Sequence, residues 1–170
     1  MNLKRIISGL IGLPIVILIF LLGNKYVIDI AITILAIISV HEYIHCFKIS
    51  NKANPISWIS YLSCILILAI NIVPNEYILP VIGLYIPFVI LALFLHIIIT
   101  DLKTTVIDIA VTCLGITYLV LFYSFIPMVY GMENGKFFVW YTILSAWGTD
   151  IFAYLVGKRF GKHKFSKISP

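Results

Sequence analysis

Six long runs of apolar residues alternate with short polar segments along almost the whole chain. The runs cover residues 6–23, 27–47, 56–73, 77–99, 105–129 and 137–157. About 20 apolar residues are what an α-helix needs to cross a bilayer, and the intervening segments contain the Gly, Pro and Asn residues typical of turns. We therefore predict an all-α fold: a polytopic transmembrane helical bundle with about six spans, forming a single domain over residues 1–170. A basic tail at 158–170 follows the last span.

The first run has a second interpretation. It follows Lys4 and Arg5, as the apolar region of a signal peptide follows a basic one. The run is long for a signal peptide, lacks a cleavage site of small residues and is followed by further apolar segments. We interpret it as the first membrane anchor.

The composition supports membrane insertion and excludes several other classes. Hydrophobic residues make up 62% of the chain and charged residues 11%, whereas soluble domains carry about 25% charged residues. A soluble globule, a disordered chain, a coiled coil and a disulfide scaffold are thereby excluded. Cys46, Cys64 and Cys113 show no CxxC spacing, so we interpret them as core residues.

The positive charges are distributed unevenly between the two sides of the predicted bundle. If the N-terminus is cytoplasmic, the inner segments contain ten Lys and Arg residues, five of them in the tail, and the outer segments contain only Lys25 and Lys136. Cytoplasmic loops carry an excess of Lys and Arg. We therefore predict that both termini face the cytoplasm.

Asp150 is the clearest candidate for a functional residue, because a carboxylate within a span costs about 2.5–3.5 kcal/mol on insertion scales. On a helix it would share one face with Tyr154 and Gly157. Small residues that allow close helix packing recur beside it at every fourth position: Ser145, Thr149, Ala153, Gly157 and Gly161. We expect Asp150 to point into the bundle or a wet cavity. A structural ion pair with a nearby Lys or Arg is the alternative.

A basic segment that contains two glycines follows Asp150. Its cations are Lys158, Arg159, Lys162 and Lys164. Their charge at a cytoplasmic helix end is also explained by the positive-inside bias and by anionic lipid headgroups. A carboxylate that can hold Mg²⁺, followed by several cations that bind phosphate, instead suits phosphoryl transfer at the membrane surface.

A second motif indicates different chemistry. His41, Glu42 and His45 match H-E-x-x-H, in which two His bind zinc and the Glu is the general base of a metalloprotease. Catalytic zinc needs a third protein ligand, and the candidates, His96, Asp101 and Asp108, lie in no recognisable ligand motif. The alternative is that Glu42 pairs with Lys48 or Arg159. We expect the remaining span carboxylates, Asp29 and Asp108, to be solvated near the helix ends.

The segment from Trp147 to Lys164, with Ser169 and Pro170, resembles that of the phosphatidate cytidylyltransferases, the CDP-diacylglycerol synthases. Their pattern is D-x-x-A-Y-x-x-G-[RK]-x-F-G-[RK]-x-[KP], followed by S-P. Weaker elements support this resemblance: Glu42-Tyr43 is similar to the family's Trp-Glu-aromatic element, and Gly115 and Tyr118-Leu119 lie where members carry a Gly and a Tyr-Leu. The same alignment makes H-E-x-x-H a coincidence, because its histidines are outside the family pattern.

The resemblance implies a multi-pass enzyme of the bacterial inner membrane that joins phosphatidate to CTP, releasing pyrophosphate, with Mg²⁺ as cofactor. Asp150 would be the catalytic residue and position Mg²⁺ or the nucleotide phosphates. The substrate phosphates would be bound by Tyr154, Lys158, Arg159, Lys162 and Lys164. Its partners would be the two substrates and membrane lipids, not nucleic acid; homo-oligomerisation is left open.

The resemblance covers roughly the first two-thirds of a family member. The family's C-terminal signature, whose carboxylates are expected to bind metal, is not among residues 1–170. We therefore expect a truncated chain whose activity on its own the sequence does not establish. Two alternatives stay open: an intramembrane zinc protease that uses His41, Glu42 and His45, and a non-catalytic membrane module that binds lipid.

Overall fold

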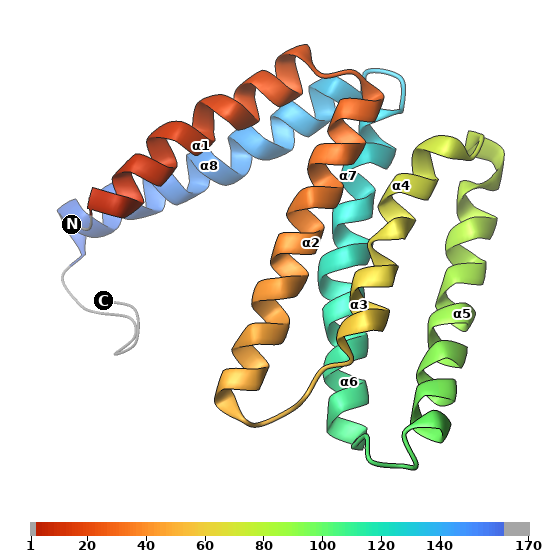
Figure 1. The fold of residues 1–170 in the computed structure, drawn as a ribbon. Helices are drawn as coiled ribbons and strands as arrows, with labels where there is room; N and C mark the ends of the chain where they lie inside the picture. The colour runs from red at the N-terminus through yellow and green to blue at the C-terminus, as the bar shows by residue number, and fades with distance from the viewer. Residues whose placement is uncertain (1–2, 162–170) are drawn as a thin grey trace.

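The computed structural model describes residues 3–161, and all of their regular structure is helical (Figure 1). Two helices form the N-terminal part: α1 (Leu3–Leu22) and α2 (Lys25–Ser50). The third apolar run forms two short helices, α3 (Ser57–Ser63) and α4 (Ile65–Ile72), interrupted at Cys64. A single 3₁₀ turn, η1 (Asn75–Tyr77), then leads into α5 (Ile78–Ile99).

The fifth apolar run is one continuous rod made of three segments. It consists of α6 (Val106–Gly115), a π-helical segment η2 (Ile116–Leu121) and α7 (Phe122–Tyr130). The last helix, α8 (Gly135–Phe160), begins after Asn134, whose φ of 58° lies in the left-handed region, and ends at Gly161.

Local signals explain several helix ends. The Asn24 side chain accepts a hydrogen bond from the Val27 N–H and so caps α2, and Asn51 ends α2 in the left-handed conformation. Thr105 and Asp108 form a capping box at the start of α6, in which each side chain accepts a hydrogen bond from the other residue's N–H. These caps satisfy backbone N–H groups that a helix end leaves unpaired.

The core lies between α2, α4 and α7. The α2 side chains that face it are spaced four residues apart, as one face of a helix requires, and are 0–4% exposed: Ile28, Ile32, Ala36, Val40 and Ile44. Leu66 and Ile67 of α4 pack against them. A second cluster, with Ile59 of α3, joins α3 to α5 and to the start of η2.

Helices α1 and α8 contact this bundle at one end, through Phe20 and Val139. Phe20 of α1 meets Trp140 of α8 edge to face, with ring centroids 6.2 Å apart, and both helices project away from the others (Figure 1). At the same end of the molecule, the Tyr130 hydroxyl donates a 2.8 Å hydrogen bond to the Gly23 carbonyl, joining α7 to the α1–α2 turn.

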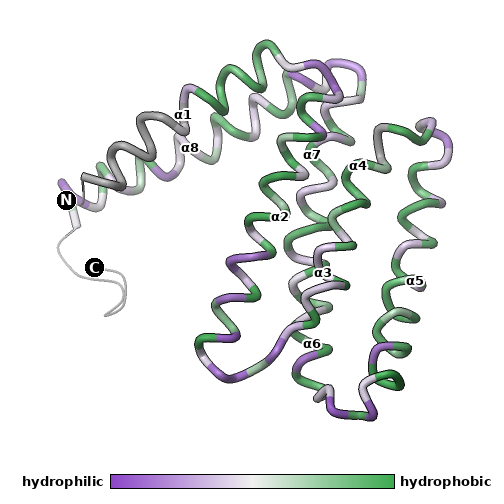
Figure 2. The backbone as a smooth tube through the Cα atoms, viewed as in Figure 1, coloured by the Kyte–Doolittle hydropathy of each residue, from purple (hydrophilic) through white to green (hydrophobic). Residues whose placement is uncertain are grey.

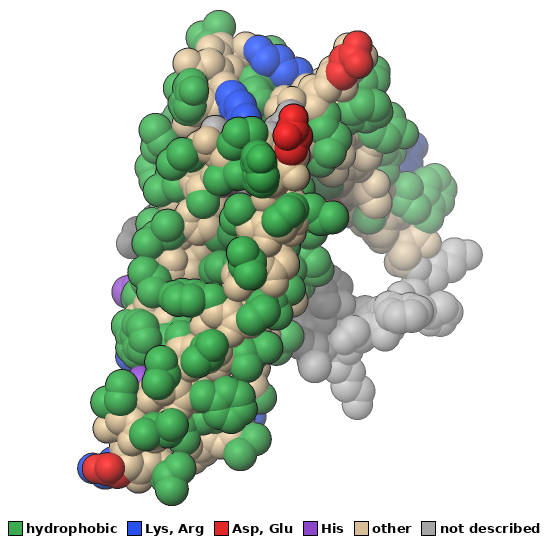
Figure 3. Space-filling view, turned by 90° about the vertical axis from the view of Figure 1, so that its right-hand side faces the viewer, with side chains coloured by type: hydrophobic (Ala, Val, Ile, Leu, Met, Phe, Trp, Pro, Cys, Tyr) green, Lys and Arg blue, Asp and Glu red, His purple; other side chains and the backbone are tan. Residues whose placement is uncertain are grey.

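Within the described residues, three helices are long and apolar enough to cross a membrane: Lys25–Ser50, Ile78–Ile99 and the rod Val106–Tyr130. In Figure 2, α5 and the upper part of α2 are mostly green, and the connections at the lower end of the bundle are mostly purple. On the face that carries α5, hydrophobic side chains cover the middle and charged ones gather at the two ends (Figure 3). An apolar surface of this extent is suited to lipid, so the chain has the features of a membrane protein. That the chain crosses the membrane six times, with both termini in the cytoplasm, remains a prediction.

Candidate functional site

Part of the predicted site forms an exposed strip along the second half of α8. Asp150, Tyr154 and Lys158 are four residues apart and therefore lie on one side of the helix. The Lys158 ammonium lies 5.9 Å from the centre of the Tyr154 ring, within cation–π range. All three side chains are exposed, so this strip can contact a ligand that approaches from outside the chain.

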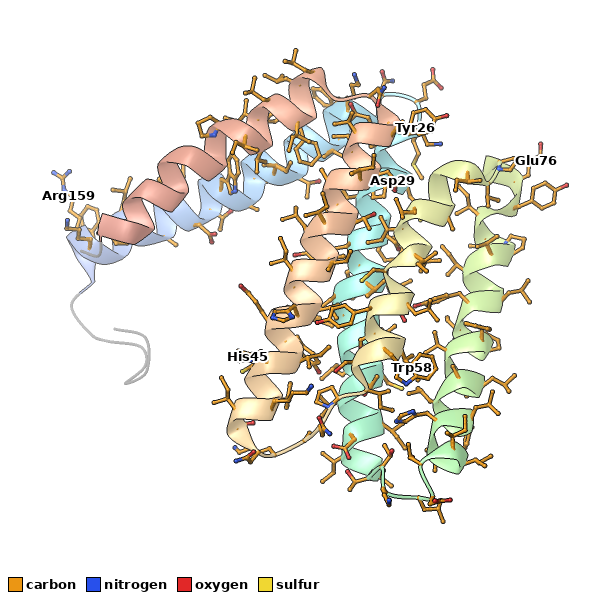
Figure 4. The ribbon with its side chains drawn as sticks, in the orientation of Figure 1. Tyr26, Asp29, His45, Trp58, Glu76 and Arg159 are labelled. Carbon is orange, nitrogen blue, oxygen red and sulfur yellow. The ribbon has the colours of Figure 1, made fainter. Side chains whose placement is uncertain are left out.

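The other predicted cations are placed differently. Arg159 is also exposed, but nine residues after Asp150 it lies roughly half a turn around the helix from the strip. Figure 4 shows Arg159 at the end of α8 that is far from α2. Lys162 and Lys164 lie outside the described residues.

The stripe of small residues is exposed along the whole of its length. A Cβ atom added at Gly157 would meet no atom within 4 Å. Thr149 donates a 2.8 Å hydrogen bond to the carbonyl of Ser145, which keeps its hydroxyl on its own helix. Asp150 is thus exposed rather than enclosed by the bundle of residues 25–130. Close packing of another helix on Ser145, Thr149, Ala153, Gly157 and Gly161 stays a prediction.

The two weaker elements of the resemblance meet inside the bundle. The half-buried ring of Tyr43 lies directly over Gly115, where an added Cβ would be only 2.6 Å from its Cε1 atom. The Tyr43 hydroxyl donates a 2.8 Å hydrogen bond to the carbonyl of Val111, one turn earlier in α6. A larger residue at position 115 would displace this ring, so the glycine is required by the close approach of α2.

The π-helical segment begins immediately after this contact. It runs from Ile116 to Leu121 and contains Tyr118 and Leu119. Tyr118 is exposed and Leu119 packs on the core. Short π-helical segments inside α-helices are frequent at functional sites. Neither this segment nor the Tyr43–Gly115 contact could be predicted from the spacing of apolar residues.

The structure does not support a zinc site at H-E-x-x-H. The rings of His41 and His45 stack with their centroids 6.3 Å apart, and the Nδ1 atom of His41 lies 2.9 Å from the Tyr61 hydroxyl, a hydrogen bond. Nowhere in the described part of the chain do three His, Cys, Asp or Glu side chains cluster as a metal would require. Lys48, one of the two cations considered as an ion-pair partner of Glu42, donates a 3.4 Å hydrogen bond to the Ser57 hydroxyl.

Asp29 and Asp108 are buried, and the expectation that they are solvated is wrong. Asp29 is 4% exposed and Asp108 is 8% exposed. Asp108 accepts hydrogen bonds from the Asn54 N–H and from Thr105. The α2–α3 connection folds over the first turn of α6 and covers Asp108 there, although both carboxylates lie near helix ends as predicted.

A polar pocket at the end of the bundle has no counterpart in the sequence motifs. It lies between the α2–α3 connection, the last turn of α5 and the start of α6. The lining includes Lys48, Trp58, His96 and Lys103. These residues come from two separate stretches of the sequence and share no motif, so only the three-dimensional structure brings the two stretches together.

Comparison with known proteins identifies the family of this chain. A model of the cytidylyltransferase family matches residues 3–170, almost the entire chain. The chain belongs to the cytidylyltransferase family. Membership agrees with the resemblance carried by the Asp150 segment and supports a nucleotidyltransferase role. Searches among curated proteins and among solved structures found no match.

Proposed function

We propose that this member of the cytidylyltransferase family transfers a cytidylyl group from CTP to phosphatidate, forming CDP-diacylglycerol and pyrophosphate. The observation that carries the proposal is the Asp150–Lys158 strip on α8, in a chain whose whole length matches the family. Exposed apolar side chains on the same half of α8, among them Ile151, Phe152 and Leu155, are suited to a substrate with two acyl chains.

The reaction is an in-line displacement at phosphorus. A phosphate oxygen of phosphatidate forms a bond to the α-phosphorus of CTP, and the bond from that phosphorus to the bridging oxygen breaks. Pyrophosphate leaves with the bonding electron pair. Both reactants are anions, so cations must offset their mutual repulsion and the charge on the leaving group.

Residues of α8 supply part of the positive charge that this reaction requires. Lys158, held beside Tyr154, and Arg159 place two positive charges in the last turn of the helix, where they can bind phosphate oxygens. Lys162 and Lys164 extend the basic segment in the sequence. We propose that these four cations and Tyr154 contact the phosphates of CTP and of the lipid.

Asp150 fits the requirements of Mg²⁺ as a single ligand. Mg²⁺ keeps several waters and is bound through one or two carboxylates together with substrate phosphates. Asp150 is an exposed carboxylate on the same strip as Lys158. Bound there, Mg²⁺ would supply charge neutralisation at the phosphates, and Asp150 would orient the ion and the nucleotide.

The connections between helices support an arrangement across the bacterial cytoplasmic membrane with both termini inside. The α1–α2, α4–α5 and α7–α8 connections lie at one end of the molecule, and the α2–α3 and α5–α6 connections lie at the other (Figure 1). Lys48, Lys52 and Lys103 belong to the second end, as the positive-inside rule requires of a cytoplasmic side. Reporter fusions at Asn51 and Glu133 would test this orientation, since the fusion at Asn51 should report the cytoplasm and the fusion at Glu133 the opposite side.

The proposed reaction is tested by product formation in detergent or vesicles. Radiolabelled CTP, phosphatidate and Mg²⁺ are supplied to the purified chain and, in parallel, to the product of the whole reading frame that contains it. We expect labelled CDP-diacylglycerol that requires all three components. Product with another lipid acceptor in place of phosphatidate would reject the substrate assignment. Lipid binding without product in both preparations would favour a non-catalytic lipid-binding module.

A further inference from the structure

The pocket at the second end of the bundle is open to the outside, has a volume of about 500 Å³ and has many polar groups in its lining. Its walls come from Lys48 at the end of α2, Asn54 in the α2–α3 connection, Trp58 of α3, His96 and Thr100 near the end of α5, and Lys103 before α6. By contrast, the pocket between α5 and η2 is lined almost entirely by apolar side chains. A polar pocket of this size is suited to a small charged group.

One wall of the pocket is fixed by hydrogen bonds from α6. The Asn54 N–H donates to the Asp108 carboxylate, and the Ile56 N–H donates to the Thr112 hydroxyl at 2.9 Å. Thr112 donates in turn to the Asp108 carbonyl at 2.6 Å. The α2–α3 connection is therefore anchored before any ligand arrives, which lowers the entropic cost of binding.

The charged residues that line the pocket are Lys48, Lys103 and Asp108, and both oxygens of Asp108 already accept hydrogen bonds. One of its oxygens accepts from the Asn54 N–H, and the other accepts from the Thr105 N–H at 2.9 Å and the Thr105 hydroxyl at 2.7 Å. Lys48 and Lys103 are exposed at the pocket's edge. Two cations and one carboxylate give this lining a net positive charge, which favours an anion.

His96 presents a hydrogen-bond donor to the same space. The Trp58 indole N–H, which can only donate, lies 3.2 Å from the Nδ1 atom of His96. Nδ1 is therefore the acceptor, and the neutral imidazole carries its proton on Nε2. Figure 4 shows Trp58 between α3 and α5. Together with the ammonium groups of Lys48 and Lys103, the His96 N–H gives the pocket hydrogen-bond donors from α2, α5 and the α5–α6 connection.

We propose that this pocket binds a phosphate group through Lys48, Lys103 and His96. Two ammonium groups and an imidazole N–H suit a group with three terminal oxygens, and Lys is a frequent ligand of phosphate. The group would be carried by a lipid headgroup or by a soluble phosphate. The inference does not depend on the proposed transfer reaction, because the pocket shares no residue with the α8 strip.

The fluorescence of Trp58 measures this binding directly. Replacing Trp140 and Trp147 by Phe leaves Trp58 as the sole tryptophan, since the chain has three. The protein in detergent is titrated with inorganic phosphate, with dihexanoyl phosphatidate, and with dihexanoyl phosphatidylcholine as the zwitterionic control. We expect a saturable change in emission with inorganic phosphate, with phosphatidate or with both, and the responding probe identifies the source. No saturable change with either, or an equal response to phosphatidylcholine, would overturn the proposal.

Matched lysine variants separate a built site from general surface charge. Lys48→Gln and Lys103→Gln should each weaken binding about tenfold. Lys52 is an exposed lysine of the α2–α3 connection that does not line the pocket. Lys52→Gln should therefore weaken binding less than about twofold. Equal weakening by all three would reject the pocket. Asp150→Asn should leave phosphate binding unchanged, so a failure of the transfer assay and a failure of this inference are distinguishable.

Discussion

Helices α2 and α8 are each 26 residues long, and each carries a stripe of residues spaced four apart. On α2 the stripe from Ile28 to Ile44 is almost completely buried against α4 and α7. On α8 the stripe from Ser145 to Gly161 is exposed, and only Gly135 and Val139 in the first turns are buried. The same periodicity therefore produces a core in one helix and an open surface in the other.

The difference comes from side-chain size and from what lies opposite. Large aliphatic side chains on α2 fill the space between three helices, which provides dispersion contacts and close packing. Small residues on α8 leave the backbone accessible, which favours close approach by a helix or a ligand. The bundle thus supplies the scaffold, and the residues proposed for chemistry lie on the helix that projects from it.

The largest effect that we predict separates activity from stability on α8. Asp150→Asn should lower CDP-diacylglycerol formation by at least about a hundredfold, because it removes the negative charge of the exposed carboxylate that orients the ion and the nucleotide. The thermal unfolding midpoint in detergent should not change, since Asp150 is exposed. Turnover and unfolding are measured on the same preparation.

Glu133→Gln is the matched control for this variant. Glu133 is also an exposed carboxylate, and it lies before the start of α8. Its replacement should leave turnover unchanged. Undiminished turnover in Asp150→Asn would contradict the assigned role, and an equal loss in both variants would show an effect of net charge instead.

Within the bundle, a change at the contact between Tyr43 and Gly115 should lower stability, whereas Asp150→Asn should lower activity alone. Gly115→Ala places a methyl group 2.6 Å from the Tyr43 Cε1 atom, and the ring is held by its hydrogen bond to Val111. We expect a loss of about 1–3 kcal/mol in the free energy of unfolding, measured by chemical denaturation in detergent.

Two further variants test the cause of that loss. Gly83→Ala in α5, where an added Cβ meets nothing within 4 Å, should be neutral or slightly stabilising. Tyr43→Leu should reduce the cost of Gly115→Ala in the double variant, because the ring that clashes is gone. A cost that is independent of residue 43 would locate the strain elsewhere.

The helices could be predicted from local pattern, and the contacts between them could not. Each apolar run forms helix to within a few residues of its expected bounds. The interruption at Cys64 has no Gly or Pro to indicate it. Burial of Asp108 depends on Asn54, 54 positions earlier in the chain, so no window of local sequence contains the cause.

The candidate functional residues likewise fall into those that local sequence could predict and those that it could not. Asp150, Tyr154 and Lys158 could be found because a helix places residues four apart on one face, and the resemblance lies in a continuous segment. Lys48, His96 and Lys103 come from separate elements of the polar pocket. Their proximity is a property of tertiary packing, which periodicity does not encode.

A smaller effect is expected at the anchor of the α2–α3 connection. Thr112→Val keeps the side-chain shape but leaves the Ile56 N–H without its acceptor. Burying that donor unpaired should cost about 1–2 kcal/mol of unfolding free energy. Thr142→Val on α8 is the control: its hydroxyl donates only to the Phe138 carbonyl at an exposed position, so no measurable cost is expected. Similar costs at both positions would contradict the anchoring role.

The smallest energetic effect is predicted for the open stripe itself. Gly157→Ala and Gly148→Ala each add a methyl group where nothing lies within 4 Å, so each should stabilise α8 by up to about 1 kcal/mol through helix propensity. Larger side chains then distinguish the two positions, because only Gly157 belongs to the stripe. Gly157→Leu should lower turnover while Gly148→Leu does not, with unfolding unchanged in both. Equal turnover in the two leucine variants would show that the stripe contacts neither a helix nor a ligand during catalysis.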